Sequence, residues 1–160
     1  MDTAGELVEA FSSAVPFALR EMAGVEAVVR DARPATRTDS SDELSAVIRL
    51  TTATGVGWLT LNLPEPTAKE LARRVLKETT DQVSAEMIRD CVGEVANVVA
   101  GQAKALLVGR PEHFTLSTPT VWASGPTDAS GGWLIRFDSD AGPFAVHLFS
   151  PSREDRGTGS

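Results

Sequence analysis

IRLTTATG at residues 48–55 aligns without a gap on IRFDSDAG at residues 135–142, at an offset of 87 positions (135 − 48 = 87). Each stretch is an alternating apolar run that ends in a turn with glycine, and a second apolar run follows it, which is typical of a β-hairpin. A helix and a further strand are expected before each hairpin, so the sequence predicts two copies of a helix-plus-three-strand unit. The expected fold is an α/β fold of the two-layer α+β type: a pseudo-twofold, six-stranded, mostly antiparallel sheet with long helices packed on it.

The remaining elements follow from apolar spacing and turn residues. Strands are expected at residues 25–29, 44–51, 57–63, 113–117 with an extension through 122, 132–138 and 144–149, and a loop at 32–43. The first helix is expected at residues 5–22, with Pro16 kinking or splitting it. A second helix is expected to start with Thr67 as N-cap and Glu70 completing a capping box, and to run to about residue 77. A third is expected from residue 81 or 84 to 108.

The composition is that of an acidic globular protein. The 160 residues carry 15 Lys+Arg and 22 Asp+Glu, which gives a formal net charge of −7. We expect a single domain at residues 1–150 and a flexible polar tail at 151–160. An acidic chain lacks the basic surface that nucleic acids or anionic membranes require. No signal-peptide pattern opens the chain and no apolar run is long enough to span a bilayer, so we expect a cytoplasmic protein.

Cysteine and histidine give little support for a metal site. Cys91 is the one cysteine, so no intrachain disulfide and no multi-thiolate metal site can form. His113 and His147 lie far apart, in stretches expected to be strands. We therefore expect no metal site in this chain, and we interpret Cys91 as a small buried residue.

The third helix has two contrasting faces. Asp90, Glu94, Asn97 and Gly101 fall together on the face opposite the core. Asparagine competes for backbone hydrogen bonds, and glycine costs about 1 kcal/mol relative to alanine inside a helix, so these choices need a reason. The simplest interpretation of an isolated Glu-x-x-Asn pair is still a solvated face. The expected core face comprises Ile88, Cys91, Val92, Val95, Val99, Gln102 and Leu106, and Met87 and Val98, between the two faces, could be a docking rim or partial core.

The pattern Asp90-x3-Glu94-x2-Asn97, followed by 21 residues and Pro119, resembles the motif of the CheC/CheX/FliY family of chemotaxis phosphatases. The surrounding DCVGEVANVVAGQAK also resembles the family's motif helix. The length of the chain and its duplicated unit resemble CheX, so the likeness covers nearly all of residues 1–150.

The number of motif copies separates the branches of this family. The first helix offers Gly5-x3-Glu9-x2-Ser12-x21-Pro34 at an offset of 85, whereas an offset of 87 would place Leu7 and Ala10 at the Glu and Asn positions. Both alignments lack the asparagine, so the first-half site is interpreted as degenerate. A single working site favours a CheX-like protein.

The resemblance implies a phosphatase that hydrolyses the phosphoaspartate of a CheY-like receiver protein. Asn97 would orient the attacking water and Glu94 would pair with a receiver lysine, with Asp90, Gly101 and Pro119 in supporting roles. The receiver would supply Mg²⁺, so the chain would need no cofactor of its own. The resemblance also implies a homodimer. The alternative is a non-catalytic binding or dimerisation module that docks on a response regulator.

Overall fold

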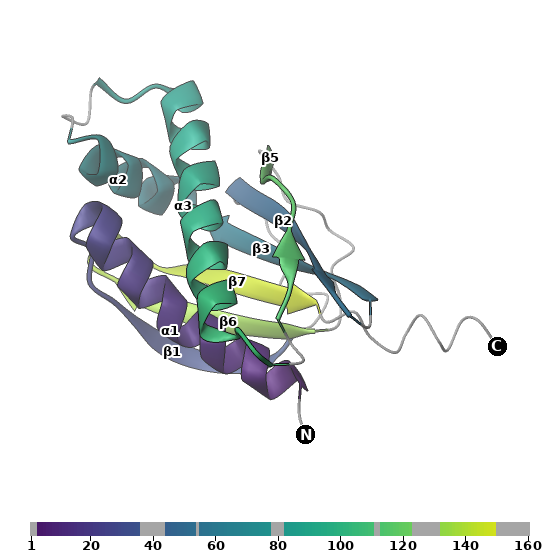
Figure 1. The fold of residues 1–160 in the computed structure, drawn as a ribbon. Helices are drawn as coiled ribbons and strands as arrows, with labels where there is room; N and C mark the ends of the chain where they lie inside the picture. Colours follow the sequence, from purple (N-terminus) through teal and green to yellow (C-terminus); the bar gives the residue numbers. More distant parts are fainter. Residues whose placement is uncertain are drawn as a thin grey trace.

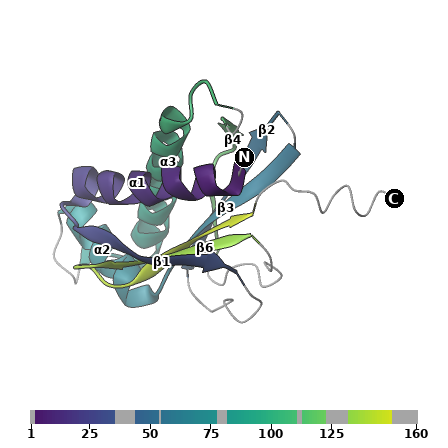
Figure 2. The same ribbon diagram turned by 90° about the horizontal axis from the view of Figure 1, so that it is seen from below.

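In the part of the chain that the structure describes, three helices pack on a single sheet (Figure 1). The computed structural model describes residues 3–35, 44–53, 55–77, 82–110, 113–122 and 132–149, so the expected tail at 151–160 and most of the expected loop at 32–43 lie outside the described residues. The helices are α1 (Thr3–Ala23), α2 (Glu65–Leu76) and α3 (Ala85–Leu106). Seen from below, α1 and α3 lie together on one side of the strands (Figure 2). The predicted two-layer α+β fold is confirmed.

The sheet has seven strands in the order β1-β6-β7-β3-β2-β4, with β5 also paired to β2, and every pair is antiparallel. Six strands were expected, and the difference lies in the stretch 113–122, which forms two short strands separated at residues 117–119. Proline has no N–H for a ladder, so a break next to Pro119 is expected. The strands are β1 (Ala27–Pro34), β2 (Leu44–Thr52), β3 (Gly55–Leu63), β4 (Thr115–Leu116), β5 (Thr120–Trp122), β6 (Trp133–Ser139) and β7 (Phe144–Phe149).

The strand pairing supports the internal repeat. Ile48 pairs with Leu59 in the first hairpin, and Ile135 pairs with Val146 in the second, so both partners are displaced by the same 87 positions. The strand before each hairpin follows the same offset, from β1 to β4 and β5. A side-chain hydroxyl closes both hairpin turns in the same way, from Thr52 Oγ1 to Gly55 O (3.3 Å) and from Ser139 Oγ to Gly142 O (2.6 Å).

The two units exchange their first strands. We call α1, β1, β2 and β3 the first unit, and α3, β4, β5, β6 and β7 the second. β1 pairs with β6 of the second unit, and β4 and β5 pair with β2 of the first. At the centre Thr60 pairs with His147, which occupies the same place 87 positions later, so the pseudo-twofold axis passes between them.

The two helices of the repeat correspond at a slightly different offset. Burial repeats at 85 positions, which selects the first of the two alignments considered from the sequence. Six buried positions of α1 match six of α3 at this spacing: Leu7 with Val92, Ala10 with Val95, Phe11 with Ala96, Ala14 with Val99, Val15 with Ala100 and Ala18 with Ala103.

Pro16 does not split the first helix, because α1 continues from Thr3 to Ala23 with Pro16 inside it. A proline removes one backbone hydrogen bond. Packing compensates here, because Phe11 and Val15 before the proline and Leu19 after it are all buried on one face.

The first strand is displaced and longer than expected. β1 begins at Ala27 and runs to Pro34, through residues that were expected to be a loop. The reason is tertiary: β6 offers a partner along this whole stretch, and Asp31 accepts a hydrogen bond from Arg136 Nε at 2.8 Å. Pro34 is tolerated because β1 is an edge strand.

Thr67 is not the N-cap that the sequence predicted. α2 begins at Glu65, with Pro64 as its N-cap residue, so Thr67 lies inside the first turn. Its side chain is buried and Oγ1 donates to Pro143 O in the β6–β7 turn (2.9 Å). The hydroxyl therefore attaches the helix to the sheet, and Glu70 pairs with Arg73 and Arg74 instead of completing a capping box.

The core lies between the helices and the sheet. Phe11 of α1 stacks on Phe114 at a centroid distance of 6.2 Å, which ties α1 to the segment after α3. His147 lies in a strand as expected and is buried, but His113 lies before β4 and not in it. In the described part of the chain, no helix has the length and apolar character needed to cross a membrane.

Candidate functional site

The motif helix starts at a well-defined cap. Ser84 Oγ accepts the Met87 N–H at 3.1 Å, and the Ser84 N–H donates to Met87 Sδ at 3.4 Å. This pair resembles a capping box in which a thioether replaces the usual carboxylate or amide. It fixes where α3 begins, and thereby which residues face solvent.

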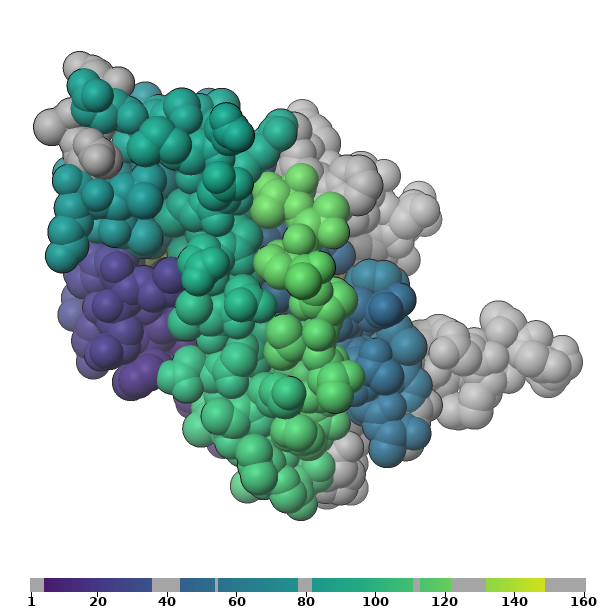
Figure 3. Space-filling model, turned by 45° about the horizontal axis from the view of Figure 1, so that its top comes forward, coloured from purple at the N-terminus to yellow at the C-terminus, as the bar shows by residue number. Residues whose placement is uncertain are grey.

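The exposed face of α3 is the one expected from the sequence. Asp90, Glu94, Asn97 and Gly101 are all exposed. Figure 3 shows this face of α3 open to solvent, between α1 on one side and the segment 113–122 on the other. The buried residues of the helix are Cys91, Val92, Gly93, Val95, Ala96, Val99, Ala100 and Ala103.

The expected core face was wrong at its end. Leu106 is 53 % exposed, and Leu107, just past the helix, is buried in its place. The cause is geometric: α3 ends at Leu106, so the helical spacing no longer applies to the next residue. Ile88 and Gln102 are half-buried, as are Met87 and Val98, which places the last two between the exposed face and the core.

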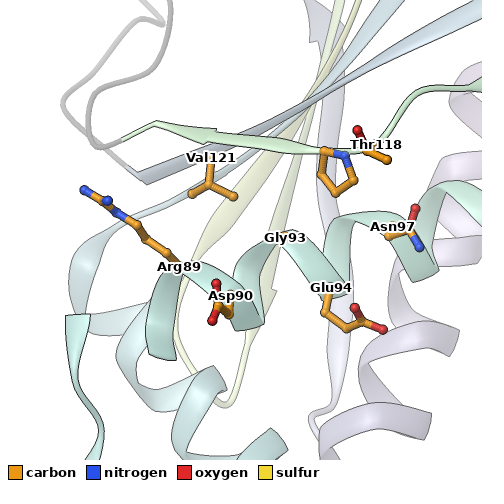
Figure 4. Close-up of a pocket in the computed structure, with 8 residues that line it drawn as sticks. Arg89, Asp90, Gly93, Glu94, Asn97, Thr118 and Val121 are labelled. Atoms are coloured by element: carbon orange, nitrogen blue, oxygen red, sulfur yellow. The ribbon is translucent and has the colours of Figure 1, made fainter. Parts of the chain in front are cut away.

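An open groove of about 290 Å³ runs between α3 and the segment 118–121. Four of the five motif residues lie along it, namely Asp90, Glu94, Asn97 and Pro119. Figure 4 shows Glu94 and Asn97 projecting from α3, with Thr118 and Val121 on the neighbouring segment. The groove is lined by Arg89, Asp90, Gly93, Glu94, Asn97, Thr118, Pro119 and Val121.

Gly93 and Gly101 have different surroundings. A Cβ on Gly93 would lie 3.3 Å from Val121 Cγ2 and 3.9 Å from Pro119 Cγ. A Cβ on Gly101 would meet nothing within 4 Å, and Gly101 does not line the groove. Of these two glycines, Gly93 is the one that another described segment approaches closely. The supporting role expected of Gly101 stays a prediction that concerns contact with a partner protein.

The Glu94 carboxylate and the Asn97 amide make no hydrogen bond or ion pair with the rest of the described chain. Both side chains are exposed and lie three residues apart on one helix face, so a single partner can contact both. A carboxylate offers a negative charge and acceptors, whereas an amide offers a donor and an acceptor but no useful acid–base chemistry. The pair can therefore bind a cation and orient a polar molecule.

Cys91 is next to this face but points into the core. Burial, and then the nearby charge of Glu94, raise the pKa of the Cys91 thiol to about 11. A neutral buried thiol is a poor nucleophile, which agrees with the structural interpretation of this residue. No group of three His, Cys, Asp or Glu side chains that could hold a metal ion occurs in the portion of the chain described.

Four groove residues were missed from the sequence: Arg89, Gly93, Thr118 and Val121. Gly93 had a usable signal, because it is a second costly glycine inside the helix, four residues before Asn97. The other three have no chemical pattern of their own. Arg89 and Thr118 adjoin motif residues and Val121 lies two positions after Pro119, and only the fold shows that the three share one surface.

The first-unit counterpart of this site lacks several of its parts. At the helix offset, Glu9 corresponds to Glu94 and Ser12 to Asn97, but Val8 stands where Gly93 is. The strands correspond at an offset of 87 positions, and at this offset the counterpart of Pro119 is Ala32 and not Pro34. The apparent match of Pro34 in the sequence is therefore not a structural equivalence.

Comparison with known proteins identifies the family. The family model for the chemotaxis phosphatase CheX matches residues 44–132. The structure is similar to CheX from Vibrio vulnificus (24 % identity, 90 % of this chain and 98 % of that chain covered, TM-score 0.75) and to a CheC-like superfamily protein from Shewanella sp. PV-4 (23 %, 93 % and 98 %, TM-score 0.78). It is also similar to the chain in a CheX–CheY–BeF3–Mg²⁺ complex from Borrelia burgdorferi (19 %, 89 % and 96 %, TM-score 0.68).

The comparison with curated proteins found no sequence match. The family model nevertheless covers more than half of the chain and includes the whole of α3 with Asp90, Glu94, Asn97 and Pro119. The chain therefore belongs to the CheX family of chemotaxis phosphatases.

Proposed function

We propose that this protein hydrolyses the phosphoaspartate of a CheY-like response regulator, with Asn97 orienting the attacking water and Glu94 pairing with a lysine of the receiver. The observation that carries the proposal is the exposed Glu94–Asn97 pair along an open groove, with both side chains free of polar partners in the described chain.

The chemistry of an acyl phosphate assigns the two roles. Hydrolysis needs a water in line with the phosphorus and stabilisation of charge on the phosphoryl oxygens. The amide of Asn97 can accept from and donate to a water at the same time, and this fixes its orientation. Glu94, one turn away, supplies the charge that would fix the docking register against a receiver lysine.

The divalent cation would come from the receiver. Such cations favour carboxylate oxygens, and the CheX relative from Borrelia burgdorferi was crystallised with CheY, BeF3 and Mg²⁺. This supports a receiver as partner and Mg²⁺ as part of the assembled site. Asp90 and Pro119 line the same groove, which supports their roles as local charge and as shaping of the adjacent segment. The homodimer and the cytoplasmic location stay predictions.

The test is the lifetime of a CheY-type receiver charged with acetyl phosphate in the presence of Mg²⁺. We expect the wild-type protein to shorten the lifetime and the Asn97→Ala variant to lose about 100-fold or more of that acceleration, because removing a group that positions the reactant is costly. Release of inorganic phosphate would be followed continuously.

Ser12→Ala is the matched control, because it removes a polar side chain from the corresponding position of α1, and its activity should equal that of the wild type. If the wild-type protein binds the BeF3-loaded receiver but never accelerates hydrolysis, the protein is a docking module and the phosphatase proposal is wrong. An Asn97→Ala variant as active as the wild type would contradict the role of Asn97.

A further inference from the structure

One wall of the groove, the segment after β4, passes close to α3 at Gly93. This residue is buried although it belongs to the exposed half of the helix, because the segment after β4 passes directly over it. The distance of 3.3 Å between Val121 Cγ2 and a Cβ placed on Gly93 would be tighter than ordinary van der Waals contact. Any side chain at this position would require Val121 Cγ2, at the surface of the wall, to move by a few tenths of an ångström.

The other side of the wall is attached to β2. Ser117 N donates to Arg49 O at 3.1 Å, and Ser117 Oγ accepts the Arg49 N–H at 3.0 Å, so a side chain continues the ladder through the break between β4 and β5. Beyond the break, Val121 pairs with Ala46. The wall therefore has little freedom to move toward the sheet, and a displacement at Gly93 must alter the groove.

A displacement of the wall at Gly93 would also affect Asn97, because Asn97 is one helical turn from Gly93 on the same surface of α3. Thr118 and Pro119 line the groove together with the Asn97 side chain. The separation of wall and helix therefore determines the space in which the Asn97 amide can orient.

We propose that Gly93 is a positioning residue: by lacking a side chain it seats Pro119 and Val121 on α3 and sets the depth of the groove in which Asn97 would orient the attacking water. The proposal rests on the proposed phosphatase function. In this role Gly93 acts through the position of the wall and not through a contact of its own with the substrate.

The experiment uses side chains of increasing size at Gly93, combined with a smaller side chain at Val121 that should relieve the contact. Gly93→Ala requires Val121 to move by a few tenths of an ångström, and Gly93→Val requires more. We expect kcat for receiver dephosphorylation to fall about tenfold and about 100-fold, respectively, because small misplacements of a catalytic group are costly. Affinity for the BeF3-loaded receiver should change less than about threefold.

Val121→Ala removes the methyl group that a Cβ on Gly93 would meet. In the double variant Gly93→Ala/Val121→Ala, we expect kcat to return to within about threefold of the value for Val121→Ala alone. Ala105→Val is the matched control for a bulkier side chain on α3, because Ala105 is exposed and lies outside the groove.

A second readout does not depend on activity. The chain contains two asparagines, Asn62 and Asn97, so their side-chain amide resonances can be assigned in a ¹⁵N-labelled sample. We expect Gly93→Ala to shift the Asn97 amide and Val121→Ala to reverse the shift. Asn62, which accepts a hydrogen bond from Ser45 in the sheet, is the internal reference and should not move.

Unchanged kcat and an unchanged Asn97 resonance in Gly93→Ala would overturn the proposal, and so would a loss of kcat that Val121→Ala does not relieve. If Gly93→Val does not fold by circular dichroism, Gly93→Ala decides the question alone. A wild-type protein without phosphatase activity would contradict the proposed function. The shift of the Asn97 side-chain amide resonance would still show whether Gly93 positions Asn97.

Discussion

At the scale of single residues, the exposed face of α3 carries a charged side chain, Glu94, and a polar but uncharged one, Asn97, three positions later. Glu94 carries a full charge at an exposed position, where pairing is worth roughly 1 kcal/mol or less and is sensitive to salt. Asn97 carries no charge, so in the proposed mechanism it would act through orientation alone. Substitutions at the two positions should therefore have different kinetic consequences.

Reversing the charge of Glu94 should weaken docking more than chemistry. We expect Glu94→Lys to raise KM for the phosphorylated receiver about tenfold, because a receiver lysine would then face a like charge, with kcat within about threefold. The salt dependence of kcat/KM should also become weaker or change sign. Initial rates at low and high salt, about 50 and 300 mM, would measure both effects.

Glu9→Lys is the control for this change, because it adds the same charge at the corresponding position of α1. It should leave KM close to that of the wild type. If Glu9→Lys and Glu94→Lys raise KM equally, the effect comes from net charge, and a specific contact of Glu94 with the receiver is contradicted.

The Cys91 thiol provides a pH-dependent prediction. Its pKa is raised from an ordinary value of 9.0 to about 11 by burial and by Glu94. Between these pH values the folded protein keeps a proton that the unfolded chain releases, so stability present below pH 9 is lost as the pH rises toward 11. We expect Cys91→Ala to unfold in urea with a smaller loss of stability over this interval than the wild type.

The thiol should also react slowly with iodoacetamide at about pH 8.5 in the folded protein, and at an ordinary rate once urea has unfolded it. Parallel pH profiles for wild type and Cys91→Ala between pH 9 and 11 would contradict the raised pKa.

The residues of the site were predictable where they are chemically unusual. Asparagine in mid-helix, with glutamate three residues before it, stood out against helix propensity, and both are exposed in the groove as expected. Gly93 carried the same kind of signal, but the contact that distinguishes it is made by a segment more than 20 residues away and is visible only in the fold. Helical spacing also failed for Leu106, since spacing does not show where a helix ends.

At the scale of elements, α2 is attached to the β6–β7 turn by polar contacts. Glu70 accepts hydrogen bonds from Arg73 Nε (3.0 Å) and Arg74 Nε (2.8 Å), and Arg74 also reaches Asp140 at 2.9 Å. The two guanidinium groups lower the pKa of the Glu70 carboxyl to about 2. The network therefore joins the helix to the turn as well as stabilising the helix itself.

Stability should depend on Glu70 in acid. A carboxyl with a lowered pKa contributes stability that is complete above its ordinary pKa of 4.5 and is lost as the pH falls toward 2. The side chain is 29 % exposed, so solvent screening limits the contribution to about 1 kcal/mol. We expect Glu70→Gln to lower the free energy of unfolding by about this amount at pH 7, and by much less at pH 2.5.

Urea unfolding at the two pH values measures the difference. Glu65→Gln is a suitable control, because Glu65 is an exposed carboxylate in the first turn of the same helix. A Glu70→Gln variant whose stability runs parallel to that of the wild type from pH 7 to 2.5 would contradict the role of the network.

The start of α2 shows what local sequence signals cannot provide. A threonine followed three positions later by glutamate matches a capping box, but both side chains make other contacts. The competing partner is the β6–β7 turn, where Gly142 has φ +127° and a Cβ would lie 2.3 Å from Thr67 Oγ1. That turn is about 75 residues from the helix in sequence, so its proximity comes only with the fold.

At the scale of the whole molecule, the repeat was visible in the sequence but the exchange of first strands was not. The offset of 87 between the hairpins predicted the two units and their pairing within each hairpin. The sequences of β1, β4 and β5 carry no signal for whether each strand pairs with the hairpin of its own unit or with that of the other unit. The structure places β1 on β6 and places β4 and β5 on β2, on opposite sides of the central β3–β7 pair.

The exchange predicts how fragments behave. If residues 1–77 and 82–160 are produced separately, each hairpin lacks its neighbouring first strand, so we expect neither fragment alone to show a cooperative thermal transition. Mixing the fragments should restore both the transition and the circular dichroism spectrum of the intact chain. A cooperative transition in an isolated fragment would contradict this expectation, and a split inside α3 after residue 95, which cuts the core helix, serves as the negative control.

The attachment of β4 and β5 to β2 has a consequence for the length of such a duplicated protein. One wall of the groove in the second unit is hydrogen-bonded to β2 of the first unit. That first unit has Ser12 at the position that corresponds to Asn97. The first unit therefore supplies the strand on which that wall rests, whether or not it has chemistry of its own. A shorter chain that kept α3 but lacked β2 would be expected to lose the groove, so the length of the protein is set by the support of the site as well as by the site itself.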